Sequence, residues 1–356
     1  MGQEEILDIL KIIAPGTVLR EGLDNILKAK TGALIAISSS EEFLDLVDGG
    51  FRIDQDFTPA NVYELAKMDG AIVISKDIKK ILMANVQLVP DHKIKTYETG
   101  TRHRTAERVA KQTNELVICI SQRRGIITVF KGDFRYVIND IASVLMRANQ
   151  MLEALEKYKS VFDNMLNLLS EHEFDDIVSL ETVANTIYRS ELIMRMEAEV
   201  KRNIIELGTE GRIVNMQLEE LIANVESEEK KIIRDYMMSQ KSPDSAEKIL
   251  KSIRKLDKKD LVNVEKIIKL LGYEIDNNIL DLNVSPRGYR ILSKIPKMPA
   301  SIIDKTVEAF GSLQGVCSAT IDELDDVEGV GEVRAKIINQ SLRRLQEQYI
   351  LKGYSI

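Results

Sequence analysis

The feature that most constrains this chain is the long stretch without proline between Pro90 and Pro243. Proline ends or kinks a helix because it lacks an N–H and clashes with the preceding turn. Within this stretch, apolar residues recur every three or four positions with one interruption at Lys159; they are Leu145, Ala148, Leu152, Leu155, Phe162, Leu166 and Leu169. This spacing predicts one long helix with an apolar seam. The seam fits packing within one chain and pairing between chains equally well.

The residues before this stretch follow a different pattern, in which helical segments alternate with short apolar runs. The expected helices are Glu4–Ile13, Arg20–Lys30 and a segment from Thr58-Pro59 to Met68. The expected strands are Gly32–Ile37, Ala71–Ile74, Ile81–Val89, Leu116–Ile120, Ile126–Phe130 and Phe134–Ile138. Several runs are almost entirely apolar, which is typical of a sheet covered on both faces. Residues 1–140 are therefore expected to form one α/β domain with a mixed central sheet.

Two all-helical domains are expected after this α/β domain. Residues 141–284 are expected to form a connecting spine, because Gly208 and Gly211 are the only glycines in most of its length. Within the spine, Ser242-Pro243-Asp244 predicts a turn. Residues 285–356 are expected to form a last domain of short helices joined by tight turns.

Composition narrows the classes of function. The formal net charge is −7, from 49 basic and 56 acidic residues, so contact with nucleic acid would need a local basic patch. Aromatic residues make up 5% and tryptophan is absent, which argues against base stacking as the main binding device. Cys119 and Cys317 are too few for a disulfide framework, so a reducing cytoplasm is expected. We find no zinc-ligand cluster, signal peptide or apolar run of membrane-spanning length.

A basic motif, Gly100-Thr101-Arg102-His103-Arg104-Thr105-Ala106, opens a helical pattern. We expect Gly100 as the entry and Thr101 as the N-cap, so that the three basic residues lie in the first turn. A helix N-terminus already carries partial positive charge, so three basic groups there require an anion, and phosphate fits best. The alternative is a basic turn that is simply solvated.

A second motif, Met68-Asp69-Gly70-Ala71, lies at a helix-to-strand junction. Gly70 has no Cβ and can bring the backbone close to a ligand, and Asp69 is the nearest carboxylate for a divalent metal or a hydroxyl. An ordinary Asp-Gly turn is the competing interpretation. Lys67 gives a further one, because Lys-x-Asp-Gly is also the pattern of ligases whose lysine takes AMP covalently.

Two later segments add candidates of the same kind. Leu88, at the end of an expected strand, could wall a base pocket, although core packing explains a strand leucine equally well. Ser121-Gln122-Arg123-Arg124-Gly125 follows another strand and could supply phosphate donors, or could be only a hairpin with solvated arginines. No Gly-x-x-x-x-Gly-Lys-Ser/Thr loop exists, which excludes the usual P-loop cradle.

The last domain contains a possible contact with a nucleic-acid backbone. Gly329-Val330-Gly331 follows an acidic turn at Asp322–Val327 and lacks the third glycine of a dinucleotide fingerprint, because Arg334 stands there. The pair suits a tight turn between helices whose N–H groups hold a backbone phosphate, with Arg334 and Lys336 adding charge. Four basic residues without an acid between them could form a second patch, or a solvated face; they are Arg287, Arg290, Lys294 and Lys297.

Together, Asp69-Gly70-Ala71 and the basic motif at Gly100–Ala106 resemble the two signature motifs of the diadenylate cyclase family. The resemblance covers essentially the whole chain, in the order cyclase domain (1–140), helical spine (141–284) and helix-hairpin-helix domain (285–356). It implies that two ATP molecules are condensed into cyclic di-AMP with release of pyrophosphate, with Mg²⁺ or Mn²⁺ as the metal.

The resemblance also implies roles for the matching positions. Asp69 would serve the metal or the attacking 3′-hydroxyl, and His103 would share the metal. Asp69, Arg102, His103 and Arg104 would be catalytic, the last three on the phosphates. The ATP-binding residues would be Gly70, Ala71, Leu88, Thr101, Arg102, His103, Arg104, Thr105, Ser121 and Arg124. The family often has arginine where Gln122 stands, so the role of that position is open.

The product of this reaction has two-fold symmetry, and one protomer with one ATP cannot close the ring. Two protomers meeting face to face can place each 3′-oxygen opposite the other α-phosphorus, so activity is expected only in a dimer. The family implies a larger assembly, an octamer of two tetramers. It also implies a preference for branched DNA and inhibition of synthesis by DNA. Because Ile295–Pro299 lacks a Gly-x-Gly, we expect the DNA contacts to come mainly from the second hairpin, at Gly329, Gly331 and Arg334.

Two other functions compete with this one. The first is an adenylyl-transferring enzyme that forms a covalent adenylate on Lys67, although no second ligase motif is found. The second is a DNA-binding structural protein whose first domain only senses a nucleotide.

Overall fold

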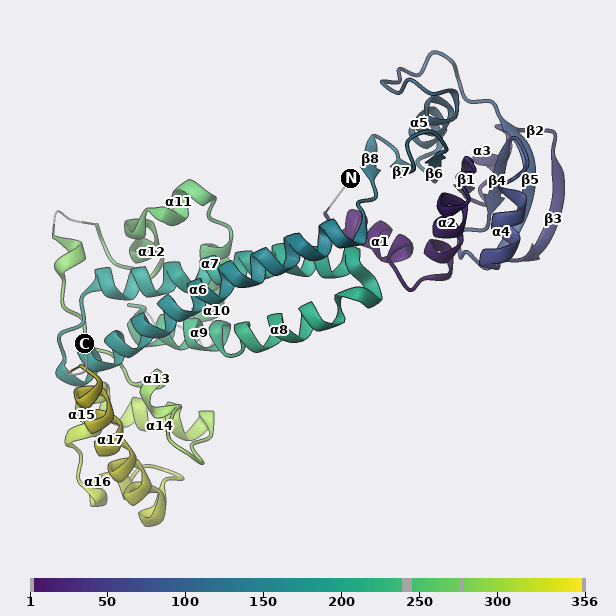
Figure 1. The fold of residues 1–356 in the computed structure, drawn as a ribbon. Coiled ribbons are helices and arrows are strands. Elements are labelled where there is room, and N and C mark those ends of the chain that lie inside the picture. Colours follow the sequence, from purple (N-terminus) through teal and green to yellow (C-terminus); the bar gives the residue numbers. More distant parts are fainter. Residues whose placement is uncertain (1–2, 239–244, 276–277, 354–356) are drawn as a thin grey trace. The chain divides into compact units, whose positions relative to one another are not determined.

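A computed structural model describes residues 3–238, 245–275 and 278–353, with side chains from residue 4 to residue 349 (Figure 1). The turn predicted at Ser242-Pro243-Asp244 lies outside these residues. The chain divides into two compact units, of which one comprises residues 1–150 with 200–216 and the other residues 151–199 with 217–356.

The first unit is built on a mixed eight-stranded sheet. Its strands are β1 (Ala33–Ile37), β2 (Val47–Asp48), β3 (Phe51–Asp56), β4 (Ala71–Ile74), β5 (Lys80–Leu88), β6 (Leu116–Ser121), β7 (Ile126–Lys131) and β8 (Phe134–Val137). The order is β2-β5-β4-β1-β6-β7-β8, and β3 also pairs with β5. Only the pair of β1 and β4 is parallel among the described ladders. The predicted mixed sheet is therefore confirmed.

Helices cover both faces of this sheet, as the apolar runs predict. Residues alternate along β1, so that Ile35 packs with α1 (Gln3–Ile13), α2 (Val18–Lys28) and α4 (Pro59–Leu65). Leu34, on the opposite face, packs with α3 (Glu41–Leu44) and α5 (Thr101–Thr113). This arrangement buries Ala106, Val109 and Ala110 of α5 against the sheet (Figure 1). The first turn of α5 lies near the start of β4 and the end of β6.

The spine is helical, as predicted. Its elements are α6 (Ile141–Asp175), α7 (Leu180–Leu207), the 3₁₀ turn η1 (Gly208–Gly211), α8 (Arg212–Ile222), α9 (Val225–Tyr236), α10 (Ser245–Arg254), α11 (Lys258–Val262), α12 (Val264–Leu270) and η2 (Ile279–Asp281). The predicted seam lies on α6, where Leu152, Leu155 and Phe162 are buried within one chain. The interruption, Lys159, forms an ion pair with Asp163. Packing within one chain thus accounts for these seam residues.

The last segment is also all-helical, with α13 (Tyr289–Leu292), α14 (Ala300–Phe310), α15 (Leu313–Ser318), α16 (Ile321–Asp325) and α17 (Gly331–Gly353) around its own core. The acidic stretch predicted as a turn is instead the helix α16. Thr320 and Glu323 form a reciprocal capping box at its start, which stabilises a helix in an otherwise acidic segment. Within the described ranges, no helix has the length and apolarity that crossing a bilayer requires.

Candidate functional site

The basic motif lies at the N-terminus of α5, but its cap differs from the prediction. Gly100 is the N-cap, with extended backbone angles, and its carbonyl accepts the first helical hydrogen bond from the Arg104 N–H at 2.9 Å. Thr101 is the first residue inside the helix and not the N-cap, so that expectation was wrong. Since glycine has no side chain to cap with, the N–H groups of this first turn are left for another acceptor.

The two sequence motifs meet through an ion pair. Nη2 of Arg102 lies 3.3 Å from Oδ1 of Asp69, and the Asp69 side chain is fully exposed at the end of its turn. Arg102 also lies against Gly32, just before β1, where any Cβ would overlap its Nη1. Gly32 therefore supports the site, although neither motif contains it and the sequence analysis missed it.

Gly70 is required by the backbone itself. Its φ is +87°, and a Cβ there would lie 2.8 Å from the carbonyl carbon of Asn85 and from the oxygen of Val86, both on β5. The Asp-Gly turn is therefore real, and it leads directly into Ala71, the buried first residue of β4. The same turn holds Asp69 outward, so the structural and functional interpretations of this motif are compatible.

A first cavity of about 440 Å³ opens beside this turn. It is lined by Leu34, Asp69, Gly70, Ala71, Asn85, Val86, Gln87, Leu88, Thr101, Arg102 and Thr105. Seven of the predicted site residues meet here, namely Asp69, Gly70, Ala71, Leu88, Thr101, Arg102 and Thr105. Leu88 is 7% exposed and belongs to the core as well as to the cavity wall. Apolar walls with a few polar groups, here one carboxylate and one guanidinium, are typical of a site for a small molecule.

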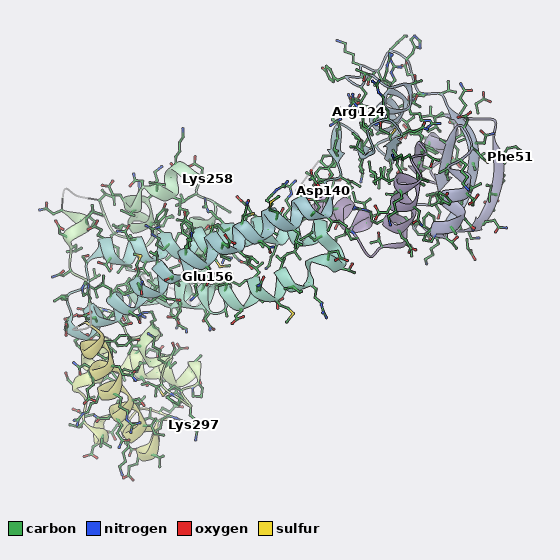
Figure 2. The ribbon with its side chains drawn as sticks, in the orientation of Figure 1. Phe51, Arg124, Asp140, Glu156, Lys258 and Lys297 are labelled. Carbon is green, nitrogen blue, oxygen red and sulfur yellow. The ribbon has the colours of Figure 1, made fainter. Side chains whose placement is uncertain are left out.

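A second cavity, of about 410 Å³, contains three more of the predicted residues, His103, Ser121 and Arg124. Its lining residues are Glu98, Thr99, Gly100, His103, Ser121, Arg123 and Arg124. Arg124 lies in the hairpin between β6 and β7 (Figure 2). Its backbone N–H donates to Oγ of Ser121 at 3.2 Å. Two further positions of these motifs, Arg104 and Gln122, are exposed and line neither cavity. Sequence reasoning missed Glu98, which precedes the motif by two residues.

His103 is less cationic than the sequence suggests. Burial lowers its pKa, Glu98 raises it, and the charges of Arg124 and Arg135 lower it further. Its Nδ1 lies 3.3 Å from Sγ of Cys119, a buried thiol whose pKa burial raises to about 12. The first turn thus holds two arginines, Arg102 and Arg104, and an imidazole whose pKa is lowered by its surroundings. Burial therefore disfavours the imidazolium form of His103.

The two residues that were expected to share a metal ion, Asp69 and His103, line different cavities. Asp69 lines the first cavity and His103 lines the second. Over the part of the chain that the structure describes, no cluster of three or more His, Cys, Asp or Glu side chains could hold a metal ion. A single exposed carboxylate can bind Mg²⁺ when phosphate oxygens of the substrate supply further ligands.

Lys67 has none of the properties of a nucleophile. It follows the end of α4, which stops at Leu65 and not at Met68 as predicted. Its Nζ pairs with Oε1 of Glu64 at 2.7 Å and lies 4.6 Å from the centre of the Tyr63 ring. The Glu64 hydrogen bond raises the pKa of Lys67, whereas a nucleophilic lysine needs a lowered pKa.

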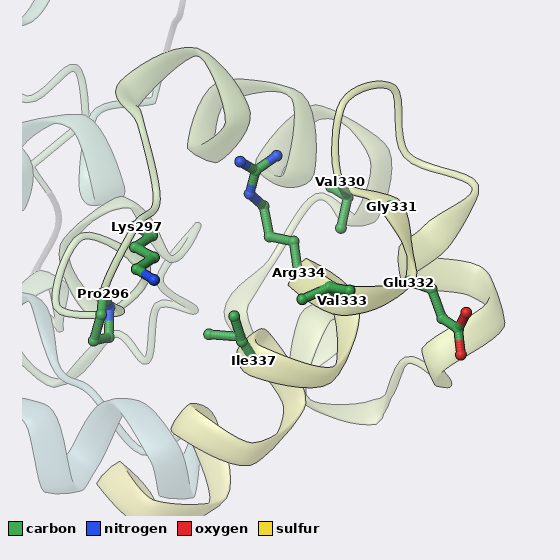
Figure 3. Close-up of a pocket in the computed structure, with 8 residues that line it drawn as sticks. All are labelled: Pro296, Lys297, Val330, Gly331, Glu332, Val333, Arg334 and Ile337. Atoms are coloured by element: carbon green, nitrogen blue, oxygen red, sulfur yellow. The ribbon is translucent and has the colours of Figure 1, made fainter.

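In the last segment, a cavity of about 400 Å³ lies between two hairpins (Figure 3). Its lining residues are Pro296, Lys297, Val330, Gly331, Glu332, Val333, Arg334 and Ile337. Gly329 and Gly331 have φ of +87° and +60°, and an Arg334 amino group donates to the Gly329 carbonyl. The predicted tight turn therefore exists, and Arg334 closes it.

The second basic patch does not exist as predicted. Arg290 is fully buried and pairs with the buried Glu173, because it joins α13 to α6. Arg287 donates to backbone carbonyls of α9, and Lys294 donates to the Tyr349 hydroxyl at 2.7 Å. Lys297 alone of the four is exposed. On α17, Lys336 is paired with Glu332 at 2.5 Å, so Arg334 is the better candidate for a phosphate contact.

Comparison with known families gives two matches that cover most of the chain. Residues 20–134 match the family described as "DisA bacterial checkpoint controller nucleotide-binding". Residues 138–280 match the "DisA bacterial checkpoint controller linker region". The first match contains both signature motifs and the walls of both cavities in the α/β unit.

Curated relatives match over nearly the full length. The "DNA integrity scanning protein DisA" of Acetivibrio thermocellus is 53% identical over 348 residues, which are 98% of this chain and 96% of that protein. The protein of the same name from Carboxydothermus hydrogenoformans is 53% identical over 350 residues, covering 98% and 99%. One from Clostridium botulinum is 52% identical over 348 residues, covering 98% of each.

Proposed function

This chain belongs to the DisA family and is a diadenylate cyclase, and on that premise we propose that it joins two ATP molecules at a contact between two copies of the chain. In the proposed reaction each ATP is both nucleophile and electrophile. Each 3′-oxygen attacks the α-phosphorus of the other ATP, the bond to the β-phosphate oxygen breaks, and pyrophosphate leaves. Two new phosphodiester bonds close the ring of cyclic di-AMP, and each 3′-hydroxyl loses one proton.

The observation that carries this proposal is the division of the site into two cavities at one helix N-terminus. The first cavity has apolar walls from Leu34, Val86 and Leu88, which suit a nucleobase. The second cavity is lined by Arg123, Arg124 and the imidazole of His103, which can donate hydrogen bonds to phosphate oxygens. Arg102 and His103 are adjacent in sequence and face different cavities, so one extended nucleotide can occupy both.

The free N–H groups at the start of α5 support the same assignment. Gly100 provides no side-chain cap, and the helix dipole favours negative charge at this point. A triphosphate passing across this turn would accept from these groups and from Arg102. The chemistry then depends on positioning and charge neutralisation and needs no covalent intermediate.

We propose that Asp69 holds the divalent metal, with phosphate oxygens as further ligands. Its exposed carboxylate in the first cavity fits a hard cation of this kind. The ion, Mg²⁺ or Mn²⁺, would neutralise charge on the phosphates. Arg102, already paired with Asp69, would orient that carboxylate. His103, in the second cavity, would contact phosphate and not share this metal.

We further propose that the last segment binds DNA through its backbone. The tight turn at Gly329 and Gly331, with Arg334 beside it and Lys297 across the cavity, supports phosphate contacts without base readout (Figure 3). Branched DNA as the preferred form, an octamer as the assembly and the cytoplasm as the location remain part of this proposal. The printed names of the relatives, DNA integrity scanning proteins, support the link to DNA.

The proposal is tested by chromatography of the products that the full chain forms from each nucleoside triphosphate with Mg²⁺ or Mn²⁺. We expect cyclic di-AMP from ATP, and loss of product in Asp69→Asn with an unchanged melting temperature. Cyclase activity that rises more than proportionally with protein concentration would support a dimeric site. Full turnover in Asp69→Asn would contradict the assignment of that residue.

A further inference from the structure

A carboxylate in the second cavity needs an explanation, because it faces a site otherwise built for anions. Glu98 lines this cavity together with His103 and Arg124, and its side chain is only 11% exposed. Its Oε1 accepts a hydrogen bond from Nε of Arg135 at 2.5 Å. Arg135 lies on β8, outside both signature motifs, and brings a further guanidinium to this corner of the domain.

Arg135 does not itself line the cavity, but the register of the sheet places it on the face that carries the cavity residue His103. Arg135 is directly opposite Phe130 in the antiparallel pair of β7 and β8, so the two side chains share one face. Phe130 packs against α5 and makes an edge-to-face contact with His103, with ring centres 6.5 Å apart. The flanking Phe134 and Tyr136 pack with the core on the other face. Arg135 is therefore on the α5 face, beside His103.

Glu98 is itself held by the segment between β5 and α5. The buried Glu107 of α5 accepts from the hydroxyl of Thr96 and, at 3.2 Å, from the N–H of Tyr97. The N–H of Glu98 then donates to the same Thr96 hydroxyl at 3.2 Å. Arg108 adds two bonds to backbone carbonyls of this segment. Glu98 is thus fixed to α5 by neighbours that do not themselves line the cavity.

The ion pair leaves most of the Arg135 guanidinium for another partner. Glu98 accepts the hydrogen bond from Nε of Arg135. Neither terminal amino group of Arg135 has a hydrogen-bond partner among the residues that the structure describes. A planar guanidinium with two free amino groups suits bidentate binding of a phosphate. The charge of Arg135 also contributes to lowering the pKa of His103, which lines the cavity.

We propose that Arg135 is a further phosphate-binding residue, which holds the β- and γ-phosphates of ATP and the pyrophosphate product, and that Glu98 is its positioning residue. This rests on the proposed function, in which the nucleoside fills the first cavity and the far end of the triphosphate enters the second. Glu98 orients the guanidinium through Nε and cancels one charge, so that pyrophosphate is not held too tightly to leave.

The test compares ligands that carry the pyrophosphate group with one that lacks it. Arg135→Gln is titrated with pyrophosphate, with ATP whose 3′-hydroxyl is absent, and with AMP, each with Mg²⁺. Loss of charge-assisted bonds should weaken binding of the first two by roughly ten- to a hundred-fold and leave AMP within about two-fold. The affinities of Arg135→Lys for these two ligands should lie between those of the wild type and of Arg135→Gln. Lysine keeps the positive charge but loses the planar guanidinium that binds phosphate through two amino groups.

Arg52→Gln is the matched control, because Arg52 is also an exposed arginine whose Nε pairs with a carboxylate, that of Asp54 at 2.7 Å on β3. It should leave all three affinities unchanged. Unchanged pyrophosphate affinity in Arg135→Gln would overturn the proposal, and so would an equal loss for AMP, which would indicate structural damage. If the wild type made no cyclic di-AMP, the proposed function would fail whatever the result of this comparison.

Discussion

Nη2 of Arg102 lies 3.3 Å from Oδ1 of Asp69, although the two residues are 33 positions apart in the sequence. This ion pair links the turn before β4 to the first turn of α5, and so it links the two signature motifs. The pair is exposed, so its effect on stability is small. The ion pair mainly orients the two side chains, because each one restricts the conformations that the other can adopt.

Gly32→Ala should impair the enzyme without unfolding it. The new methyl group would meet the end of the Arg102 side chain, which is flexible and can move away at little cost in stability. Arg102 would then leave its contact with Asp69, and we expect cyclase activity to fall at least about ten-fold, as for the loss of one charge-assisted bond. Steady-state kinetics and a thermal melt check this; wild-type activity would contradict it.

Gly70→Ala should act through stability instead. Alanine at a φ of +87° is strained, and its Cβ would overlap the β5 backbone, which cannot move as a side chain can. Gly49→Ala is the control, since Gly49 has a φ of +62° and open space around it. We expect Gly70→Ala to lose about 1–3 kcal/mol more in the free energy of unfolding. Denaturant titration of both variants measures this, and equal losses would disprove the clash.

Lys67→Ala should keep full cyclase activity. Lys67 is exposed, paired with Glu64 and outside both cavities, so it has no part in the proposed reaction. Intact-protein mass spectrometry after incubation with ATP should show no covalent AMP on the wild type. An AMP adduct that disappears in Lys67→Ala would instead favour the adenylyl-transferring alternative.

Glu229→Gln should make the protein more stable at neutral and alkaline pH. Glu229 is fully buried on α9, and burial and the neighbouring Glu191 raise its pKa to about 8. The folded chain thus keeps this proton up to about pH 8, whereas the unfolded chain releases it near pH 4.5. Wild-type stability from this group therefore falls as pH rises between these values. The gain in melting temperature of the variant should grow from pH 5 to pH 8; a gain independent of pH would exclude ionisation as the cause.

The sequence predicted the strands that are almost entirely apolar and missed a strand that is mostly polar. The apolar runs gave β1, β4 and β6, because these strands are buried on both faces. The sequence analysis missed β3, because Phe51–Asp56 is mostly exposed and half of its residues are charged. This strand is held in the sheet by its pairing with β5. Such a strand has no apolar signal to detect.

The sequence identified candidate site residues but not their contacts or their burial. The motifs identified Asp69 and Arg102, but their contact depends on the fold, and so does the room that Gly32 leaves for the guanidinium. The apparent basic patch failed because charge in a sequence carries no information on burial. Arg290, fully buried against Glu173, looks the same in sequence as the exposed Lys297. The three-domain division stays a prediction.

The most direct measurement is a crystal structure of the full chain with ATP lacking the 3′-hydroxyl, which cannot react, and Mg²⁺. We predict the adenine against Leu88 in the first cavity and the β- and γ-phosphates between His103 and Arg124 in the second. Electron density for the metal should lie at Asp69. A nucleotide bound elsewhere, or both cavities empty at saturating ligand, would contradict the assignment of this site.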